Sequence, residues 1–314
     1  TAYEQDMARG CYAYGVDIRR GSWFGNSAVA QTAMRSLELR WLQLGDELMA
    51  SGELLYPEDP RLVGVLSEIV ALAGLLHADV PGLRLLSDKA RSSGNWSVVT
   101  PLGNTRGTTN WLAVDAEALL AQSPAQRRFL LGSALGHLQC GHGILFTSRV
   151  ITVRDGGLGL TARLLRPWTK VAVFSADRAG MLAAGELDAS LMAVAAETSS
   201  QAAYLPEFPE YSIRRRALED FDHTRVVARM RTQRSLLTER AGRAIAGAQL
   251  RAKAAEKGAE ASEAEPTDSE PASSEAESTE AESTATGDDN RGVPRSAWPV
   301  ARCDQRLTRR LGLL

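Results

Sequence analysis

The segment from 257 to 290 limits what this chain can fold into, because it contains almost no side chain that could join a hydrophobic core. It consists of Glu, Ser, Ala, Thr and Pro with a few glycines and aspartates. Such a composition buries too little apolar surface to offset the entropy cost of ordering the chain. We therefore expect a folded domain over residues 1–256, a disordered acidic linker over 257–290, and a separate segment over 291–314.

The segment 291–314 interleaves large apolar side chains with arginines. The apolar residues are Trp298, Val300, Leu307, Leu311, Leu313 and Leu314, and the arginines include Arg295, Arg302, Arg306, Arg309 and Arg310. This pattern is typical of a short basic amphipathic peptide. We interpret it as a tethered tail that docks a partner, with an unstructured basic end as the alternative.

Hydrophobic periodicity in the folded part predicts helices followed by a small sheet. Apolar residues recur at helical spacing over 27–50 and 60–76, which indicates two packed helices. The next part of the sequence contains short segments of residues that favour β-strands, at 83–86, 96–100 and 108–114, separated by Ser, Gly and Asn. Such pieces between turn residues indicate strands.

The sequence after the sheet predicts helices again. Ser123 and Pro124 make a typical helix start, with serine as the N-cap and proline at the first helical position. The helices that we expect cover 123–146, 175–184, 188–204 and 213–255. The predicted fold class is α+β, mainly helical with a small sheet, and the overall hydrophobic content of 44% suffices for a substantial core.

Cysteine usage and hydropathy favour the cytoplasm. Cys11, Cys140 and Cys303 lie far apart without a C-x-x-C pair, so neither a disulfide framework nor a thiolate zinc site is indicated. The longest apolar run, 62–76, contains Glu68 and is shorter than the roughly 20 residues of a membrane span. We expect a soluble protein in a reducing compartment, with no membrane span.

The segment around His137 carries part of a zinc-binding motif. In H-E-x-x-H, two histidines four residues apart share a helix face and bind one zinc, while the glutamate activates the metal-bound water. Here Leu138 stands at the glutamate position and Gly141 at the second histidine. The next histidine, His142, follows His137 by five residues, about 140° round a regular helix, so we expect the two rings to point to different faces.

The same segment resembles the HtpX-like and CAAX-prenyl-protease-like zinc metallopeptidases, whose helix reads approximately L-G-H-E-L-G-H-x-x-x-G-H. Residues 134–142, Ala-Leu-Gly-His-Leu-Gln-Cys-Gly-His, match this pattern if the four residues E-L-G-H are missing, which would give His137 the roles of two ligands. The resemblance extends over roughly 81–230. It implies a zincin-like domain with zinc as its cofactor.

Two downstream elements also resemble this family. Asp177, Arg178 and Gly180 match the family's E-x-x-A-D-R-x-G helix, in which the glutamate is the third zinc ligand, but Val173 takes the glutamate position. His223 and Arg229 match the spacing of the family's H-P-x-x-x-x-R element. The resemblance implies that Asp177 orients a ligand, and that His223 and Arg229 contact substrate or the oxyanion.

We predict from these losses a catalytically inactive peptidase relative that works as a peptide- or protein-binding module. An extended peptide would add to the sheet edge beside the His137 helix. Zinc would be absent or weakly held, with His137, His142 and Cys140 as the residual ligands. The alternative is an active zinc-dependent metalloendopeptidase with an atypical site.

Simpler interpretations of the same residues stay open. His137 fits a core histidine, and Cys140 fits a small buried apolar residue. A run of arginines could bind nucleic acid through phosphates; it comprises Arg214, Arg215, Arg216, Arg225, Arg229, Arg231 and Arg234. Because acidic residues interrupt this run and no aromatic stacking platform accompanies it, we disfavour nucleic-acid binding.

Overall fold

The computed structural model describes residues 2–93, 95–103, 110–156, 159–199, 208–235, 293–294 and 296–313. The chain divides into two compact units, of which the first comprises Thr1–Ala228 with Ser296–Leu314 and the second Arg229–Arg295. The predicted acidic linker, 257–290, lies outside the described residues. The sheet and the helices that surround it belong to the first unit.

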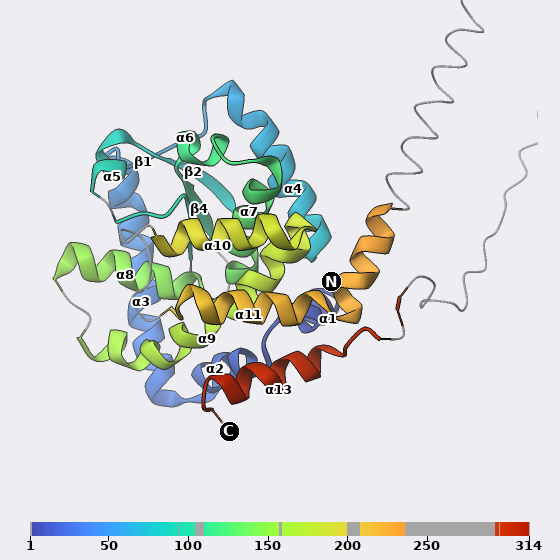
Figure 1. Ribbon diagram of the computed structural model, residues 1–314. Coiled ribbons are helices and arrows are strands. Elements are labelled where there is room, and N and C mark those ends of the chain that lie inside the picture. The colour runs from blue at the N-terminus through green and yellow to red at the C-terminus, as the bar shows by residue number, and fades with distance from the viewer. Residues whose placement is uncertain are drawn as a thin grey trace, which may run out of the picture. The chain divides into compact units, whose positions relative to one another are not determined.

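Helices and one small sheet make up this unit (Figure 1). In chain order they are α1 (Ala2–Tyr12), α2 (Gly15–Asn26), α3 (Ala28–Ala50), β1 (Leu54–Leu55), a 3-10 turn (Pro60–Leu62), α4 (Val63–Leu76), β2 (Gly82–Leu86), α5 (Asp88–Ser92), β3 (Val99–Leu102), β4 (Trp111–Val114), α6 (Ala116–Leu120), α7 (Pro124–Gln139), α8 (Gly143–Asp155), α9 (Gly159–Ala184), α10 (Leu187–Ser199), α11 (Tyr211–Asp222) and α13 (Val300–Arg310). The predicted class, mainly helical α+β, is confirmed, as is the order of helices, sheet and helices.

The four strands form one sheet in the order β1-β2-β4-β3. The central pair, β2 and β4, is parallel, and both outer pairs are antiparallel. Every residue of the outer strand β3 is buried, and both α7 and α8 pack against it. This packing places the His137 helix directly beside a sheet edge.

The helices α7 and α9 cross at unusually short range. A side chain added at Gly136 would place its Cβ only 2.5 Å from the Cβ of Ala179, and one added at Gly180 would lie 2.8 Å from the carbonyl oxygen of Phe129. Gly132 is equally crowded, by Ala183. Glycine and alanine therefore let the two backbones approach closely, and this crossing fixes which residues of α9 face α7.

Several helix boundaries differ from the prediction. The helix expected over 123–146 is two helices, because the chain turns at Gly141 between α7 and α8. The helix expected over 175–184 begins far earlier, at Gly159, and contains Pro167. The helix expected over 213–255 breaks after Asp222, and its part beyond 235 lies outside the described residues. Residues 200–204 of another predicted helix also lie outside them.

The segment 291–314 contributes α13 to the first unit. Asp304 accepts a hydrogen bond from the backbone N–H of Gly15 at 3.0 Å and pairs with the buried Arg178 at 2.7 Å. The hydroxyl groups of Tyr14 and Thr308 are 2.8 Å apart. We expected this segment to dock a partner, and the structure shows it docked on its own domain, where α10, α11 and α13 follow one another across one face (Figure 1).

No helix in the described part of the chain combines the length and apolarity needed to cross a bilayer.

The crossing of α7 and α9 predicts a contrast between two glycine substitutions. Gly136→Ala inserts a methyl group where the α9 backbone must move, and overpacking of this kind costs about 1–3 kcal/mol. Gly74→Ala, in α4, meets no atom within 4 Å, and should leave stability unchanged or raise it by up to about 1 kcal/mol because alanine favours helix. Urea denaturation measures both free energies, and equal effects would contradict the close crossing.

Candidate functional site

The turn after α7 brings two histidines together. The helix ends in a left-handed glycine cap, in which Gly141 has φ 76° and the N–H of His142 donates to the carbonyl of His137 at 2.8 Å. As a result the Nδ1 atoms of His137 and His142 lie 3.1 Å apart. Our expectation that the two rings point to different faces assumed one continuous helix, and it is wrong because the helix stops at Gln139.

A buried carboxylate extends this pair into a chain of three groups. The Nε2 atom of His142 lies 2.9 Å from Oδ1 of Asp17 on α2. Trp168 of α9 donates its indole N–H to the same oxygen at 2.7 Å, and the Ser175 hydroxyl donates to Oδ2. His142 and Asp17 are almost completely excluded from solvent. A buried charge with this many donors is well compensated.

If His137 and His142 are both neutral, their hydrogen bonds determine which ring nitrogen of each carries the proton. If Asp17 is ionised, Nε2 of His142 carries the proton that the carboxylate accepts, so Nδ1 of His142 is an acceptor. His137 then donates from its own Nδ1 and presents a bare lone pair on Nε2. Burial, together with nearby His142 and Arg214, holds the pKa of His137 well below its ordinary value, which keeps this ring neutral.

A small cavity of about 100 Å³ lies beside His137. Its walls come from α7, α9, α10, α11 and the chain around β3, and they include Ser133, Ala134, His137 and Val173. The two positions that we assigned from the family pattern, His137 and Val173, therefore do face one space. Leu138 and Gly141 do not line it and border a larger cleft instead.

Two charged residues, Glu197 and Arg214, line this cavity. Arg214 of α11 makes two hydrogen bonds with the Asp177 carboxylate, at 2.8 Å and 2.5 Å, and a third with Glu197 at 2.9 Å. Asp177 and Arg214 are each about 1% exposed. Burial raises the pKa of Glu197, and the neighbouring Arg214 partly opposes this effect. Asp177 thus serves an ion pair that joins α9 to α11.

We predict that removal of the Arg214 charge is strongly destabilising. Arg214→Met leaves Asp177 and Glu197 without their cation, and breaking such a buried pair costs about 3–5 kcal/mol. The matched control is Arg215→Met at the next position, where the side chain is exposed and pairs with Glu219, so a much smaller loss is expected. Similar losses in urea denaturation at neutral pH would contradict the role of Arg214.

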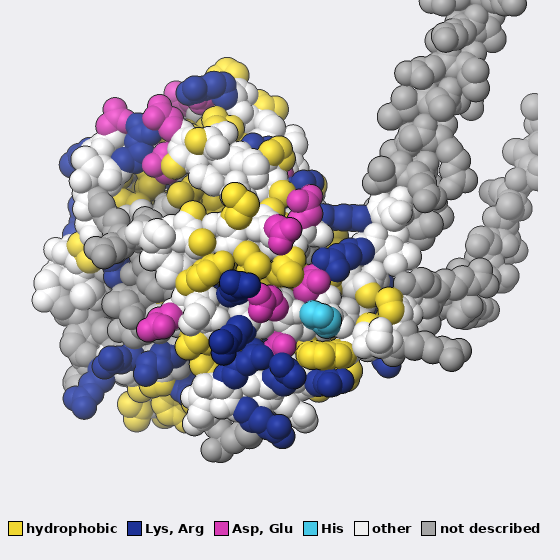
Figure 2. Space-filling model, in the orientation of Figure 1, with side chains coloured by type: hydrophobic (Ala, Val, Ile, Leu, Met, Phe, Trp, Pro, Cys, Tyr) yellow, Lys and Arg dark blue, Asp and Glu magenta, His cyan; other side chains and the backbone are white. Residues whose placement is uncertain are grey.

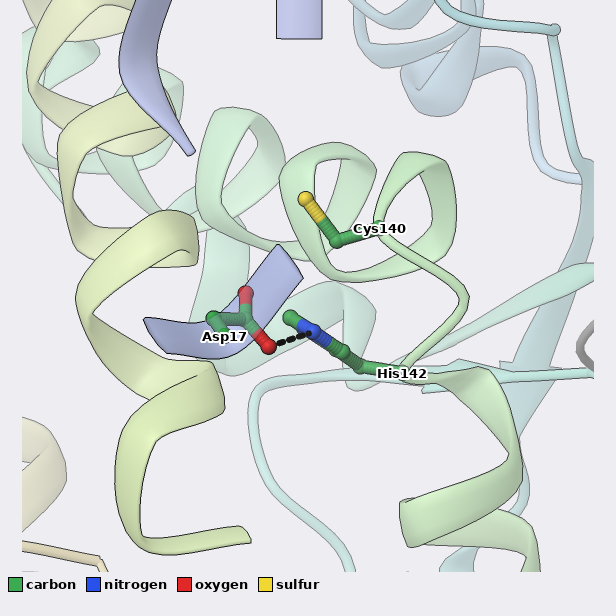
Figure 3. A group of neighbouring side chains, drawn as sticks. All are labelled: Asp17, Cys140 and His142. Atoms are coloured by element: carbon green, nitrogen blue, oxygen red, sulfur yellow. Dashed lines mark hydrogen bonds and ion pairs between the residues drawn. The ribbon is translucent and has the colours of Figure 1, made fainter. Parts of the chain in front are cut away.

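A cleft of about 930 Å³ lies on the other side of the turn after α7. Residues of α1, α2 and α3 line it, together with Trp168 and the end of α7. Asp17 and Cys140 both reach this cleft. Together with His142 they form a group whose ligand atoms all lie within 4.8 Å of one another, so the group could hold a metal ion (Figure 3).

The cysteine of this group carries its proton in the absence of metal. The Cys140 residue is partly exposed, but its thiol is buried beside the Asp17 carboxylate, Tyr12 and Ser175. Burial, and then the Asp17 charge, raise the pKa of the Cys140 thiol far above its ordinary value. A thiol with a raised pKa is a poor nucleophile, so the cluster does not resemble a cysteine-hydrolase site.

The remaining predicted site residues lie elsewhere. His223 is exposed at the end of α11, its Nδ1 donates to the carbonyl of Glu219 at 2.7 Å, and its ring stacks on Trp298. It is not among the described residues that line the His137 cavity. Arg229 belongs to the second unit.

Two arginines of the predicted basic run, Arg214 and Arg215, have acidic partners within the protein. Figure 2 shows Lys and Arg side chains over α11 and α13 with acidic side chains among them. Arg214 pairs with Asp177, and Asp220 accepts from Arg306 and Arg310 of α13. Within the predicted run, the buried Arg214 is therefore not available to a phosphate group.

Comparison with known proteins gave no match. No family model, no curated protein and no solved structure is similar to this chain.

Proposed function

We propose that this chain is a catalytically inactive relative of the HtpX-like zinc metallopeptidases that acts by binding a protein or peptide. The sequence from Leu131 to His142, Leu-Gly-Ser-Ala-Leu-Gly-His-Leu-Gln-Cys-Gly-His, fits the family pattern L-G-H-E-L-G-H-x-x-x-G-H without a gap. It departs from the fixed letters only at Ser133 and Ala134. This alignment replaces the one with four missing residues.

The observation that carries the proposal is the lining of the small cavity. Under the alignment without a gap, Ser133 and His137 take the two histidine positions, Ala134 takes the glutamate, and Val173 takes the third ligand. All four residues line the one cavity of about 100 Å³. Residues four apart on a helix share a face, and the close crossing of α7 and α9 supplies Val173 opposite them.

The side chains at these positions do not fit a catalytic zinc ion. Such a site needs three strong protein ligands and an open position for water, whereas Val173 offers no ligand atom and Ser133 only a weak hydroxyl. Ala134 cannot serve as the general base. Of the four residues, only His137 offers a strong ligand atom, the Nε2 nitrogen of its ring. The alternative of an active metalloendopeptidase would require ligands from other parts of the chain.

The structure favours the larger cleft over the sheet edge as the binding surface. Strand addition needs free backbone N–H and C=O groups. Pro101 of β3 lacks an N–H group, the Thr147 hydroxyl already bonds to both backbone groups of Gly103, and all of β3 is buried. The cleft of about 930 Å³ is far roomier and has both acidic and basic walls, among them Asp6, Arg9 and Glu38.

A repair experiment tests the proposal. The variant Ser133→His/Ala134→Glu/Val173→Glu, made in a Cys140→Ser background, should bind one zinc ion per chain with His137 as a ligand. The Cys140→Ser variant without the three repairs should bind none in the cavity and show no chelator-sensitive cleavage of casein. Metal analysis by mass spectrometry and a cleavage assay with and without chelator give the readouts.

The control adds His137→Gln to the repaired variant and should abolish its zinc binding. Chelator-sensitive cleavage by the unaltered chain would refute the loss of catalysis. A repaired variant that folds, as judged by circular dichroism and urea denaturation, yet gains no zinc would refute the family assignment.

A further inference from the structure

We propose that Asp17, Cys140 and His142 form a binding site for a thiophilic divalent cation of the zinc class, separate from the small cavity beside His137. The site belongs to the turn that ends α7 and to helix α2. It does not depend on the family assignment, because in the alignment without a gap none of its ligands stands at the position of a peptidase zinc ligand.

The ligand set and its spacing favour this class of metal. Thiolate, imidazole and carboxylate together suit zinc, whereas calcium and magnesium require oxygen ligands. Two ligand atoms on one tetrahedral zinc lie about 3.3–3.8 Å apart, given bond lengths of about 2.0–2.3 Å. The three ligand atoms are already within 4.8 Å of one another, so rotation of the Cys140 side chain and small shifts close the site. In Figure 3 the ring of His142 extends to the Asp17 carboxylate, whereas the sulfur of Cys140 points upward and must rotate to join them.

The surrounding groups already hold the ligands as a metal site requires. Metal-binding histidines usually bond through their second ring nitrogen, and metal-binding carboxylates are themselves hydrogen-bonded. His142 meets this condition through His137 at 3.1 Å, and Asp17 through Trp168 at 2.7 Å and Ser175. The metal would take the place of the proton that now lies between His142 and Asp17.

Access comes from the larger cleft. His142 is completely buried, but Asp17 and Cys140 line the cleft of about 930 Å³, so a cation enters from their side. Water in the cleft can fill the fourth coordination position. The same cleft is lined by Asp6, Glu38 and Asp79 and by two arginines, Arg9, which pairs with Asp6, and Arg35.

Metal binding would reverse the direction of the hydrogen bond between His137 and His142. When Nε2 of His142 binds the metal, the remaining proton of His142 sits on Nδ1 and donates to Nδ1 of His137. His137 then carries its proton on Nε2, where it previously had a lone pair. The two rings keep the same number of protons, and only the Cys140 thiol releases one to solvent. Occupancy of the metal site thus converts His137 from an acceptor to a donor at the small cavity.

Cobalt provides the probe. Titration of the reduced full chain with Co²⁺ should produce one equivalent of binding with a sulfur-to-cobalt charge-transfer band, and Zn²⁺ should displace it. Cys140→Ser should abolish the band, and Trp168→Phe, which removes a hydrogen bond to Asp17, should weaken Co²⁺ binding about 10-fold or more. Cys11→Ser and Cys303→Ser should leave both band and affinity unchanged.

A measurement on the unaltered chain guards against variants that fail to fold. Zn²⁺ should stabilise the native protein and raise the midpoint of its urea denaturation under reducing conditions. Absence of the cobalt band, or an unchanged urea midpoint at saturating Zn²⁺, would overturn the proposal. Neither result would affect the interpretation of the repair experiment, because that experiment uses the Cys140→Ser background.

Discussion

The close crossing of α7 and α9 is the constraint on which the rest of this structure depends. Glycine and alanine at the contact allow backbone approaches that any larger side chain would block. This short range puts Val173 opposite Ser133 and His137, and it sets the direction in which Asp177 meets Arg214. The cavity beside His137 and the Asp177–Arg214 ion pair therefore both depend on a helix contact made by glycine and alanine. Small residues here determine geometry more than they supply buried area.

The sequence predicted the class and order of the fold, because periodicity and turn residues are local signals. Ser123 is the N-cap of α7, as expected, and it also forms a capping box with Gln126. Boundaries failed where tertiary contacts decide them. Apolar residues occur on both sides of the turn, up to Leu138 and again from Ile144, so hydrophobicity alone could not reveal that Gly141 adopts a left-handed conformation and divides the segment. Helices α1 and α2 were not predicted from the sequence, and few of their side chains are buried: Tyr12 in α1, and Val16, Asp17 and Phe24 in α2.

The site was foreseen only in part. His137, His142 and Cys140 were singled out because they are close in sequence, and Val173 because a family pattern assigned it. Asp17, Trp168 and Ser175 were missed, since 125 positions separate Asp17 from His142 and no spacing rule connects them. The register of the motif also escaped the sequence argument: Ser133 and Ala134 resemble ordinary helix residues until the cavity shows that they face the same space as His137.

The docking of α13 has a consequence for how the protein is made. Arg178 is the neighbour of Asp177 on α9 and is nearly fully buried, yet its carboxylate partner is Asp304. A ribosome must therefore synthesise more than a hundred further residues after Arg178 before this charge can be neutralised. Until then, burial of the Arg178 side chain costs free energy because its charge has no carboxylate partner. The backbone N–H of Gly15 also lacks its acceptor, the Asp304 carboxylate. Completion of the first unit is thus a late event in translation.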